Sequence, residues 1–159
     1  MSRQTLADFT GTTPEFRLEQ FFAGRVVADG LMEDRFGRVR RQFAATIEGT
    51  FDGATLTLDE DFRYTDGEAE RRHWEIRREG ERGYVGTAKG VIGEARGAVN
   101  GQAFHWRYSY KFSYRGRTLK VRFDDWMFLQ HNGVVINRAR VKKLGLTLGT
   151  VWLFFRKVT

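Results

Sequence analysis

The sequence predicts an all-β fold, a single antiparallel up-and-down β-barrel of about eight to ten strands with a short N-terminal helix. Apolar and polar residues alternate along most of the chain, as they do in strands that bury one face. The apolar stretches are short and are separated by dipeptides that favour hairpin turns. The 159 residues include 18 glycines and one proline, and 41% are hydrophobic, which is enough for one core. We therefore expect one domain over 1–159, with 1–12 as a flexible N-terminal segment.

The short helix is predicted over Thr13–Phe22. Thr13 can cap its first turn, Pro14 fits the first helical position and Glu15 complements the helix dipole. The phenylalanines of this segment could close one end of a sheet. Gly24 ends the helix, and strand alternation begins there.

The clearest strand reads AFHWRYSYKFSY, and its inner face would carry Phe104, Trp106, Tyr108, Tyr110 and Phe112. A two-residue turn at Arg115-Gly116 places Trp106 opposite Asp125 on the neighbouring strand. The same turn places Arg107 opposite Asp124. Asp125 is therefore expected inside with the aromatic row, and Asp124 outside.

A second hairpin brings another carboxylate inside. A two-residue turn at Asp52-Gly53 pairs Phe43 with Phe62 and Ala45 with Glu60. The inner row of the second strand would be Leu56, Leu58, Glu60, Phe62 and Tyr64.

Two further hairpins need three-residue loops. Loops that end at Gly67 and Gly133 use the left-handed backbone conformation, which glycine accepts. They place Arg72 opposite Glu60 and Asn137 diagonal to Asp125. This register also turns inward a set of apolar residues: Trp74, Ile76, Val135, Ala139 and Val141. We prefer it because an unpaired ionised carboxylate inside a protein costs several kcal/mol.

Other strands carry glycine and alanine on one face, among them the stretches 24–30, 86–88 and 93–97. Such strands permit sharp coiling or leave space behind them. Small-residue walls opposite a tall aromatic wall are typical of a closed barrel with an off-centre cavity.

The formal net charge of +7 favours anionic partners, including an acidic membrane surface. The basic residues are scattered, which predicts solvated strand faces. Because the chain has no cysteine, it forms neither disulfides nor thiolate metal sites. The sequence does not specify an oligomeric state. It shows no signal-peptide pattern and no segment of membrane-spanning length, so we expect a soluble, cytoplasmic protein.

The residues that metal, cofactor, nucleic-acid and catalytic sites need are missing from the sequence or dispersed along it. His73 and His105 are expected on outer faces and His131 in a turn, so we predict no metal site and no cofactor. The aromatic residues alternate with polar ones as in a core, which disfavours nucleic-acid binding. No phosphate loop, nucleophile triad or dinucleotide fingerprint is present, and no catalytic residue is assigned.

Several motifs together resemble a bacterial family known as domain of unknown function 3833. They are FFAGRVVADG, DRFG, FRYTDG, RRHWEI, WRY, FDDWMFL and INRARVKKLG, between about Phe21 and Phe155. The resemblance implies no activity. It implies an association with the cell envelope, because members often look like lipoproteins with a signal segment and a lipid-modified cysteine. This sequence shows neither of these two features. The architecture is also similar to that of lipocalins and related calycin barrels, although the place of the lipocalin Gly-x-Trp reads Gly24-Arg25-Val26.

The candidate site consists of the inner polar residues and the aromatic residues beside them: Glu60, Arg72, Asp125, Asn137, Trp74, Trp106, Tyr108 and Tyr110. They could form a buried polar network that fixes strand register, or they could line a ligand pocket. We expect a non-enzymatic protein that binds a small apolar or amphipathic, lipid-like molecule in the barrel. The alternative is a structural or interaction barrel with a filled core, whose basic outer surface meets an acidic partner or membrane. A third hypothesis is an isomerase that uses an inner carboxylate.

Overall fold

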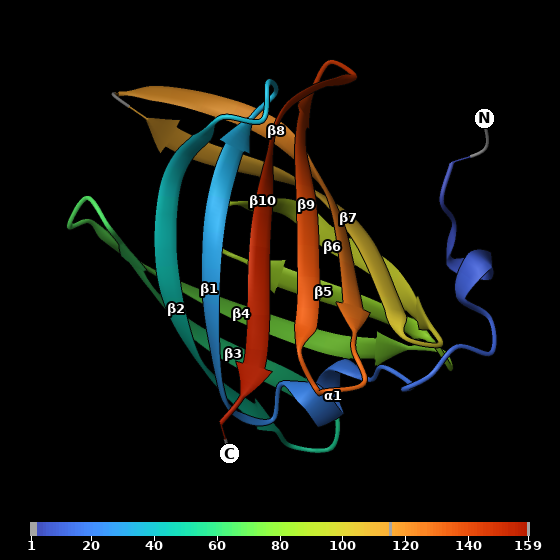
Figure 1. Ribbon diagram of the computed structural model, residues 1–159. Coiled ribbons are helices and arrows are strands. Elements are labelled where there is room, and N and C mark those ends of the chain that lie inside the picture. The colour runs from blue at the N-terminus through green and yellow to red at the C-terminus, as the bar shows by residue number, and fades with distance from the viewer. Residues whose placement is uncertain (1–2, 115, 159) are drawn as a thin grey trace.

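The computed structural model describes residues 3–114 and 116–158. They form a closed barrel of ten antiparallel strands, in which neighbours in sequence pair and β10 closes onto β1 (Figure 1). The strands are β1 (Gly24–Asp34), β2 (Val39–Phe51), β3 (Thr55–Tyr64), β4 (Ala69–Glu79), β5 (Gly83–Ala88), β6 (Val91–Asn100), β7 (Ala103–Tyr114), β8 (Arg117–Leu129), β9 (Val135–Lys143) and β10 (Leu146–Lys157). The prediction of an all-β, up-and-down barrel is confirmed.

The predicted helix is shorter than expected. It covers only Leu18–Phe21 (α1), and its N-cap is Arg17 rather than Thr13. Residues 13–16 donate no helical hydrogen bond, and the Phe16 N–H donates instead to the Gly101 carbonyl, in the turn between β6 and β7, at 2.9 Å. This tertiary hydrogen bond takes precedence over the local helix signals at Thr13 and Pro14.

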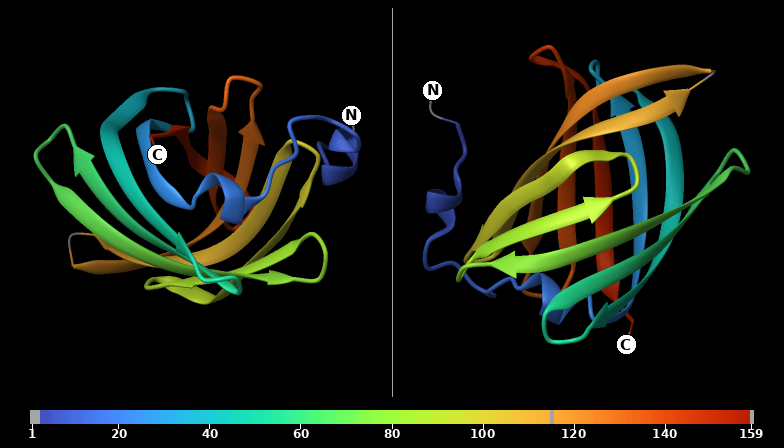
Figure 2. Two further views of the ribbon diagram at one scale, coloured as in Figure 1. Left: turned by 90° about the horizontal axis from the view of Figure 1, so that it is seen from below. Right: turned by 180° about the vertical axis from the view of Figure 1, so that it is seen from behind.

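The segment around α1 closes one end of the barrel. Phe16, Phe21 and Phe22 are buried and meet edge to face, with ring centroids 6.0 Å and 4.9 Å apart. The view from below shows α1 lying across that end (Figure 2). At Gly49 of β2 a side chain would collide with the Phe22 carbonyl, so glycine lets this plug approach the sheet.

The N-terminal residues include a 3₁₀ turn, η1 (Leu6–Phe9), on the outside of the barrel. The Phe9 ring lies 6.0 Å from that of Trp126 and 5.4 Å from that of Phe128. The Asn100 side-chain amide donates to the Leu6 carbonyl at 2.8 Å. These contacts hold η1 against β6 and β8. Within the described residues, no helix has the length and apolar character needed to cross a membrane.

Three of the four hairpin registers are confirmed. Trp106 pairs with Asp125 across β7 and β8, although Arg115 of the predicted turn lies outside the described residues. Glu60 pairs with Arg72 across β3 and β4. Asn137 pairs with Met127 and is therefore diagonal to Asp125. Gly67 and Gly133 have φ angles of 92° and 86°, as their three-residue loops require.

The prediction for the β2–β3 hairpin is wrong by two residues. Phe43 pairs with Tyr64, and Ala45 pairs with Phe62. The turn is centred on Gly53 and Ala54, because the Asp52 carboxylate accepts the N–H groups of Ala54 and Thr55 at 2.8 Å and 2.7 Å. A shift of two residues keeps every side chain on its face, so Glu60 still lies inside.

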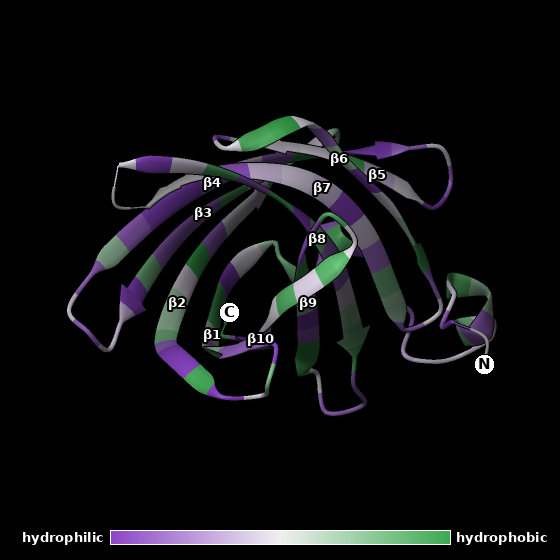
Figure 3. Cartoon of the chain, turned by 90° about the horizontal axis from the view of Figure 1, so that it is seen from above, coloured by the Kyte–Doolittle hydropathy of each residue, from purple (hydrophilic) through white to green (hydrophobic). Residues whose placement is uncertain are grey.

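The core lies inside the barrel and follows the alternation of the strands (Figure 3). The small-residue strands β5 and β6 pack against an aromatic side chain. A Cβ atom on Gly86 or Gly97 would lie 2.8 Å or 2.2 Å from Trp106 side-chain atoms. These glycines therefore give Trp106 its place in the interior.

Candidate functional site: an aromatic-walled cavity inside the barrel

The barrel interior contains a cavity of about 170 Å³. Its walls are mainly apolar, and Leu18 of α1 and Phe22, which follows α1, line the end that this helix covers. Seven of the eight candidate residues line it: Glu60, Arg72, Trp74, Trp106, Tyr108, Asp125 and Asn137. Tyr110, the eighth, lines the wide depression at the open end. All eight residues thus lie on the inner side of the sheet, as the sequence predicted.

One wall of the cavity is aromatic. The Trp74 ring centroid lies 5.0 Å from that of Trp106 and 5.4 Å from that of Tyr108. Tyr108 stacks on Phe123, with centroids 5.0 Å apart and an angle of 13° between the rings. These contacts hold flat, rigid surfaces against the empty space, a common feature of sites for apolar ligand groups.

Asp125 of β8 lies within this apolar surrounding and is 6% exposed. The Asn137 amide donates to its Oδ1, and the Trp106 indole Nε1 donates to its Oδ2 at 3.3 Å. The Asn137 amide also donates to the Trp126 carbonyl at 2.9 Å. Asp125 thus joins three neighbouring strands, because its donors come from β7 and β9.

Burial is the main influence on the Asp125 carboxyl group and raises its pKa to about 7. The hydrogen bonds from Asn137 and Trp106 act in the opposite direction, since they stabilise the charged form. Asp125 therefore takes up and releases a proton near neutral pH while it remains inside the protein.

Glu60 and Arg72 face each other across β3 and β4, but the Arg72 guanidinium group donates its hydrogen bond to Glu70. Arg72 Nη2 donates to Glu70 Oε1 at 2.8 Å, and the Tyr64 hydroxyl donates to Glu70 Oε2 at 3.1 Å. Glu70 was not among the predicted site residues. Its position two residues before Arg72 on β4 would have placed it on the same inner row.

Burial also raises the pKa of Glu60, to about 7. The positive charge of Arg72 lowers this pKa, whereas the negative charges of Asp125 and Glu70 raise it. The cavity thus contains two carboxyl groups, Glu60 and Asp125, that each change charge near neutral pH.

Arg72 also has an unused hydrogen-bond donor. Among the described residues, the buried side-chain atoms without a hydrogen-bond partner are Arg72 Nε and Arg138 Nε. The Arg72 guanidinium carbon lies 5.4 Å from the Phe62 ring centroid and 5.2 Å from that of Tyr110. A buried N–H group without an acceptor is costly, so this atom marks a place where an acceptor would bind favourably.

The cavity adjoins a wide depression that includes the end of the barrel opposite α1 and extends along outward-facing residues of β1 to β4, such as Arg25, Glu48 and His73. Six residues line both spaces: Met32, Glu60, Tyr64, Arg72, Phe123 and Val151. Arg41 lies over the Tyr64 ring at 3.4 Å and bonds to Asp66 and Glu68 of the β3–β4 loop. Arg72 and its partners therefore lie where the enclosed cavity meets the open end.

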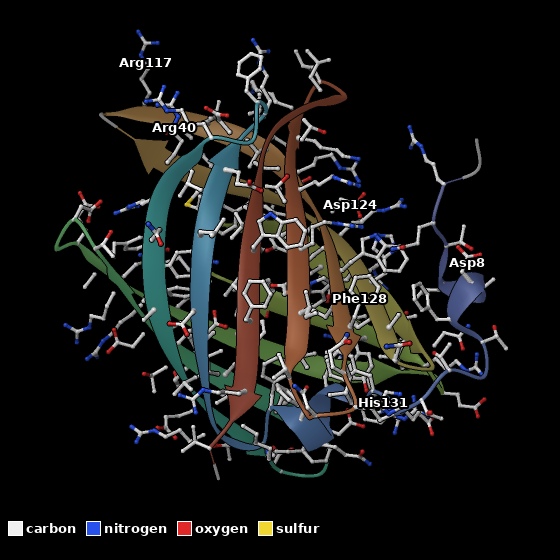
Figure 4. The ribbon with its side chains drawn as sticks, in the orientation of Figure 1. Asp8, Arg40, Arg117, Asp124, Phe128 and His131 are labelled. Carbon is white, nitrogen blue, oxygen red and sulfur yellow. The ribbon has the colours of Figure 1, made fainter. Side chains whose placement is uncertain are left out.

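No histidine of the described residues lines the inner cavity, although His73 lines the wide depression. His73 Nδ1 lies 2.7 Å from Asp59, and His105 stacks on Trp126 while its Nε2 lies 2.5 Å from Asp124. Asp124 is on the outer wall as predicted (Figure 4), but His105 and Lys142 approach it more closely than Arg107 does, at 3.9 Å. Over 3–114 and 116–158, no three His, Asp or Glu side chains gather as a metal site would need.

Comparisons with known proteins place the chain in a family without assigning an activity. The chain matches none of the curated proteins with which it was compared. The sequence profile of one family, described as "Protein of unknown function (DUF3833)", matches residues 1–157. Because the match covers nearly the whole sequence, the chain belongs to the DUF3833 family.

Proposed function

We propose that this protein binds a small amphipathic molecule in its barrel. The apolar part of the ligand would lie in the cavity against Trp74, Trp106 and Tyr108, and the polar part would lie near Arg72. The observation that carries this proposal is the unpartnered Arg72 Nε atom, which is buried at the junction of an apolar cavity and an open end.

The size of the cavity supports a particular arrangement of the ligand. Pockets for drug-sized ligands measure roughly 300–1,000 Å³. The enclosed space of about 170 Å³ is smaller. It would hold a short alkyl chain or one ring, and the rest of the molecule would extend into the depression at the open end.

The polar surroundings support a head group that accepts hydrogen bonds. Arg72 Nε offers a donor, and Glu60 offers a second one when it is protonated. Glu70 already balances the charge of Arg72, so the head group need not be fully ionised. A carbonyl, hydroxyl or carboxylic acid group satisfies these conditions.

The experiment is a fluorescence titration with 1-anilinonaphthalene-8-sulfonate, an amphipathic probe that brightens in apolar sites. Ala139 lines the cavity, so Ala139→Leu fills part of it and should weaken probe binding about tenfold. Ala44→Leu is the matched control, because Ala44 is exposed on the outer face of β2 and its enlargement should leave binding unchanged.

Arg72→Lys tests the head-group contact, since lysine keeps the positive charge but has no Nε–H. We expect weaker probe binding with a folded barrel by circular dichroism. Equal affinity in the wild-type protein, Ala139→Leu and Ala44→Leu would place the probe outside the cavity and overturn the proposal.

A further inference from the structure

The open end of the barrel has two hairpin tips with unusual side chains. In the β1–β2 tip Phe36 is 80% exposed, and in the β9–β10 tip Leu144 is 93% and Leu146 66% exposed. The tips are neighbours, because β1 pairs with β10 from Asp34 and Gly149 onward. The view from above shows hydrophobic residues at the β9–β10 tip (Figure 3). Together these residues make an exposed apolar patch at one end of the molecule.

The β9–β10 turn places a leucine where the backbone disfavours it. Leu144 and Gly145 form a two-residue turn between paired Lys143 and Leu146, and both have positive φ, 51° and 79°. Asparagine, aspartate and glycine are the usual residues at the first position of such a turn. Leucine there is disfavoured by its backbone conformation and by its exposure to water. Such a conflict with folding preferences points to a role outside the fold.

Positive charges surround the apolar tips. Arg35 and Arg38 are exposed beside Phe36, and the Arg35 guanidinium carbon lies 4.8 Å from the Phe36 ring centroid. Lys142 and Lys143 precede Leu144, and the chain from there to Lys157 contains no acidic residue. Asp34, the acidic residue of the first tip, is bonded to Arg40 at 2.9 Å.

The shape of this end brings the tips to one level. The β1–β2, β7–β8 and β9–β10 hairpins reach furthest from α1, whereas the acidic β3–β4 hairpin ends lower (Figures 1 and 2). Arg40 and Arg117 lie at this end of the barrel (Figure 4). A flat surface laid across this end would therefore meet apolar side chains and cations first.

We propose that these two tips dock the protein on an anionic lipid bilayer, with Phe36, Leu144 and Leu146 inserted at the interface and Arg35, Arg38 and Lys143 against the lipid head groups. Bilayer interfaces accept protruding apolar side chains without a shaped partner, and anionic head groups attract clustered lysine and arginine. A second copy of this chain fits less well, because a symmetric contact would bring the same positive charges together.

This proposal is independent of ligand binding in the cavity. It does, however, orient the barrel so that its open end faces the membrane. A molecule leaving the bilayer would then reach the opening lined by Tyr64 and Arg72 first.

Sedimentation with vesicles tests the docking surface. The wild-type protein should sediment with vesicles of equal parts phosphatidylglycerol and phosphatidylcholine, less with phosphatidylcholine alone, and less as salt rises. The double variant Phe36→Ser/Leu144→Asn should bind about tenfold more weakly or worse. Asparagine tolerates the left-handed turn, so the fold should be retained. Phe154→Ser is the control, since Phe154 is 45% exposed on the barrel wall and should not affect binding.

A second readout uses the absence of cysteine from the chain. An environment-sensitive dye attached through Phe36→Cys or Leu144→Cys should shift to the blue when anionic vesicles are added. The same dye attached through Ala54→Cys, in the β2–β3 turn at the opposite end, should not shift. Failure of the wild-type protein to sediment, unchanged binding of the double variant, or equal shifts at all three positions would overturn the proposal. So would self-association that the double variant loses without any vesicle binding, since that would assign the tips to a second copy.

Discussion

Asp125 shows how much a single residue depends on the strands around it. The sequence predicted its inward direction from one hairpin register, and the structure confirms that register. Alternation together with the three-residue loop that ends at Gly133 identified Asn137 as a diagonal neighbour. The hydrogen bond from Asn137 to the Trp126 carbonyl could not be predicted, since it depends on the rotamer of the amide.

Substitutions of Asp125 should separate a hydrogen-bonding role from a charged one. Asp125→Asn should lower the free energy of unfolding by only about one or two kcal/mol, because an amide oxygen can still accept from Trp106 or Asn137. Asp125→Leu should cost more, since both donors lose their acceptor. Denaturant unfolding of the three proteins measures this. Equal losses for Asn and Leu would contradict a structural role for these hydrogen bonds.

The raised pKa of Asp125 also predicts how stability changes with pH. The folded protein holds the proton up to about pH 7, whereas the unfolded chain releases it near the ordinary value. Stability from this group is therefore full below the unfolded pKa and falls as pH rises toward 7, by at most about 1.4 kcal/mol per pH unit. The cost of Asp125→Asn should accordingly shrink between about pH 5 and about pH 8. A constant cost over that range would mean that Asp125 titrates alike in both states.

At the scale of the elements, the turn residues predicted the hairpins more accurately than the capping residues predicted the helix. Gly67 and Gly133 specified their loops because glycine accepts positive φ, as found. The hydrogen bonds of the Asp52 side chain move the centre of its turn by one residue and therefore change the strand register by two, which alternation does not predict. The helix signal at Thr13 was overridden by the distant Gly101 carbonyl, which no local pattern contains.

The β9–β10 turn offers a stabilising substitution. Leu144→Asn should raise the free energy of unfolding by about 1 kcal/mol, because asparagine adopts the left-handed conformation at a lower cost than leucine. Leu146→Asn is the control, since Leu146 is also exposed but lies in strand β10. Thermal melts of the two variants decide this. A loss of stability in Leu144→Asn would show that the leucine contributes to the fold.

At the scale of the whole molecule, the closed barrel and its inner polar residues could be predicted, but the arrangement at the open end could not. Alternation gives the face of each side chain, which was enough to gather Glu60, Arg72 and Asp125 inside. It does not give the partner of a long side chain, so the pairing of Arg72 with Glu70 was missed. The size of the cavity also depends on how Trp106 packs against Gly86 and Gly97.

The central claim, that the barrel holds a small amphipathic molecule, is tested most directly by native mass spectrometry of the protein purified from its own host. We expect a fraction of the protein to retain a small molecule, which denaturation releases and which Ala139→Leu retains less than Ala44→Leu does. A mass equal to that of the bare chain in every preparation, before and after denaturation, would contradict the claim.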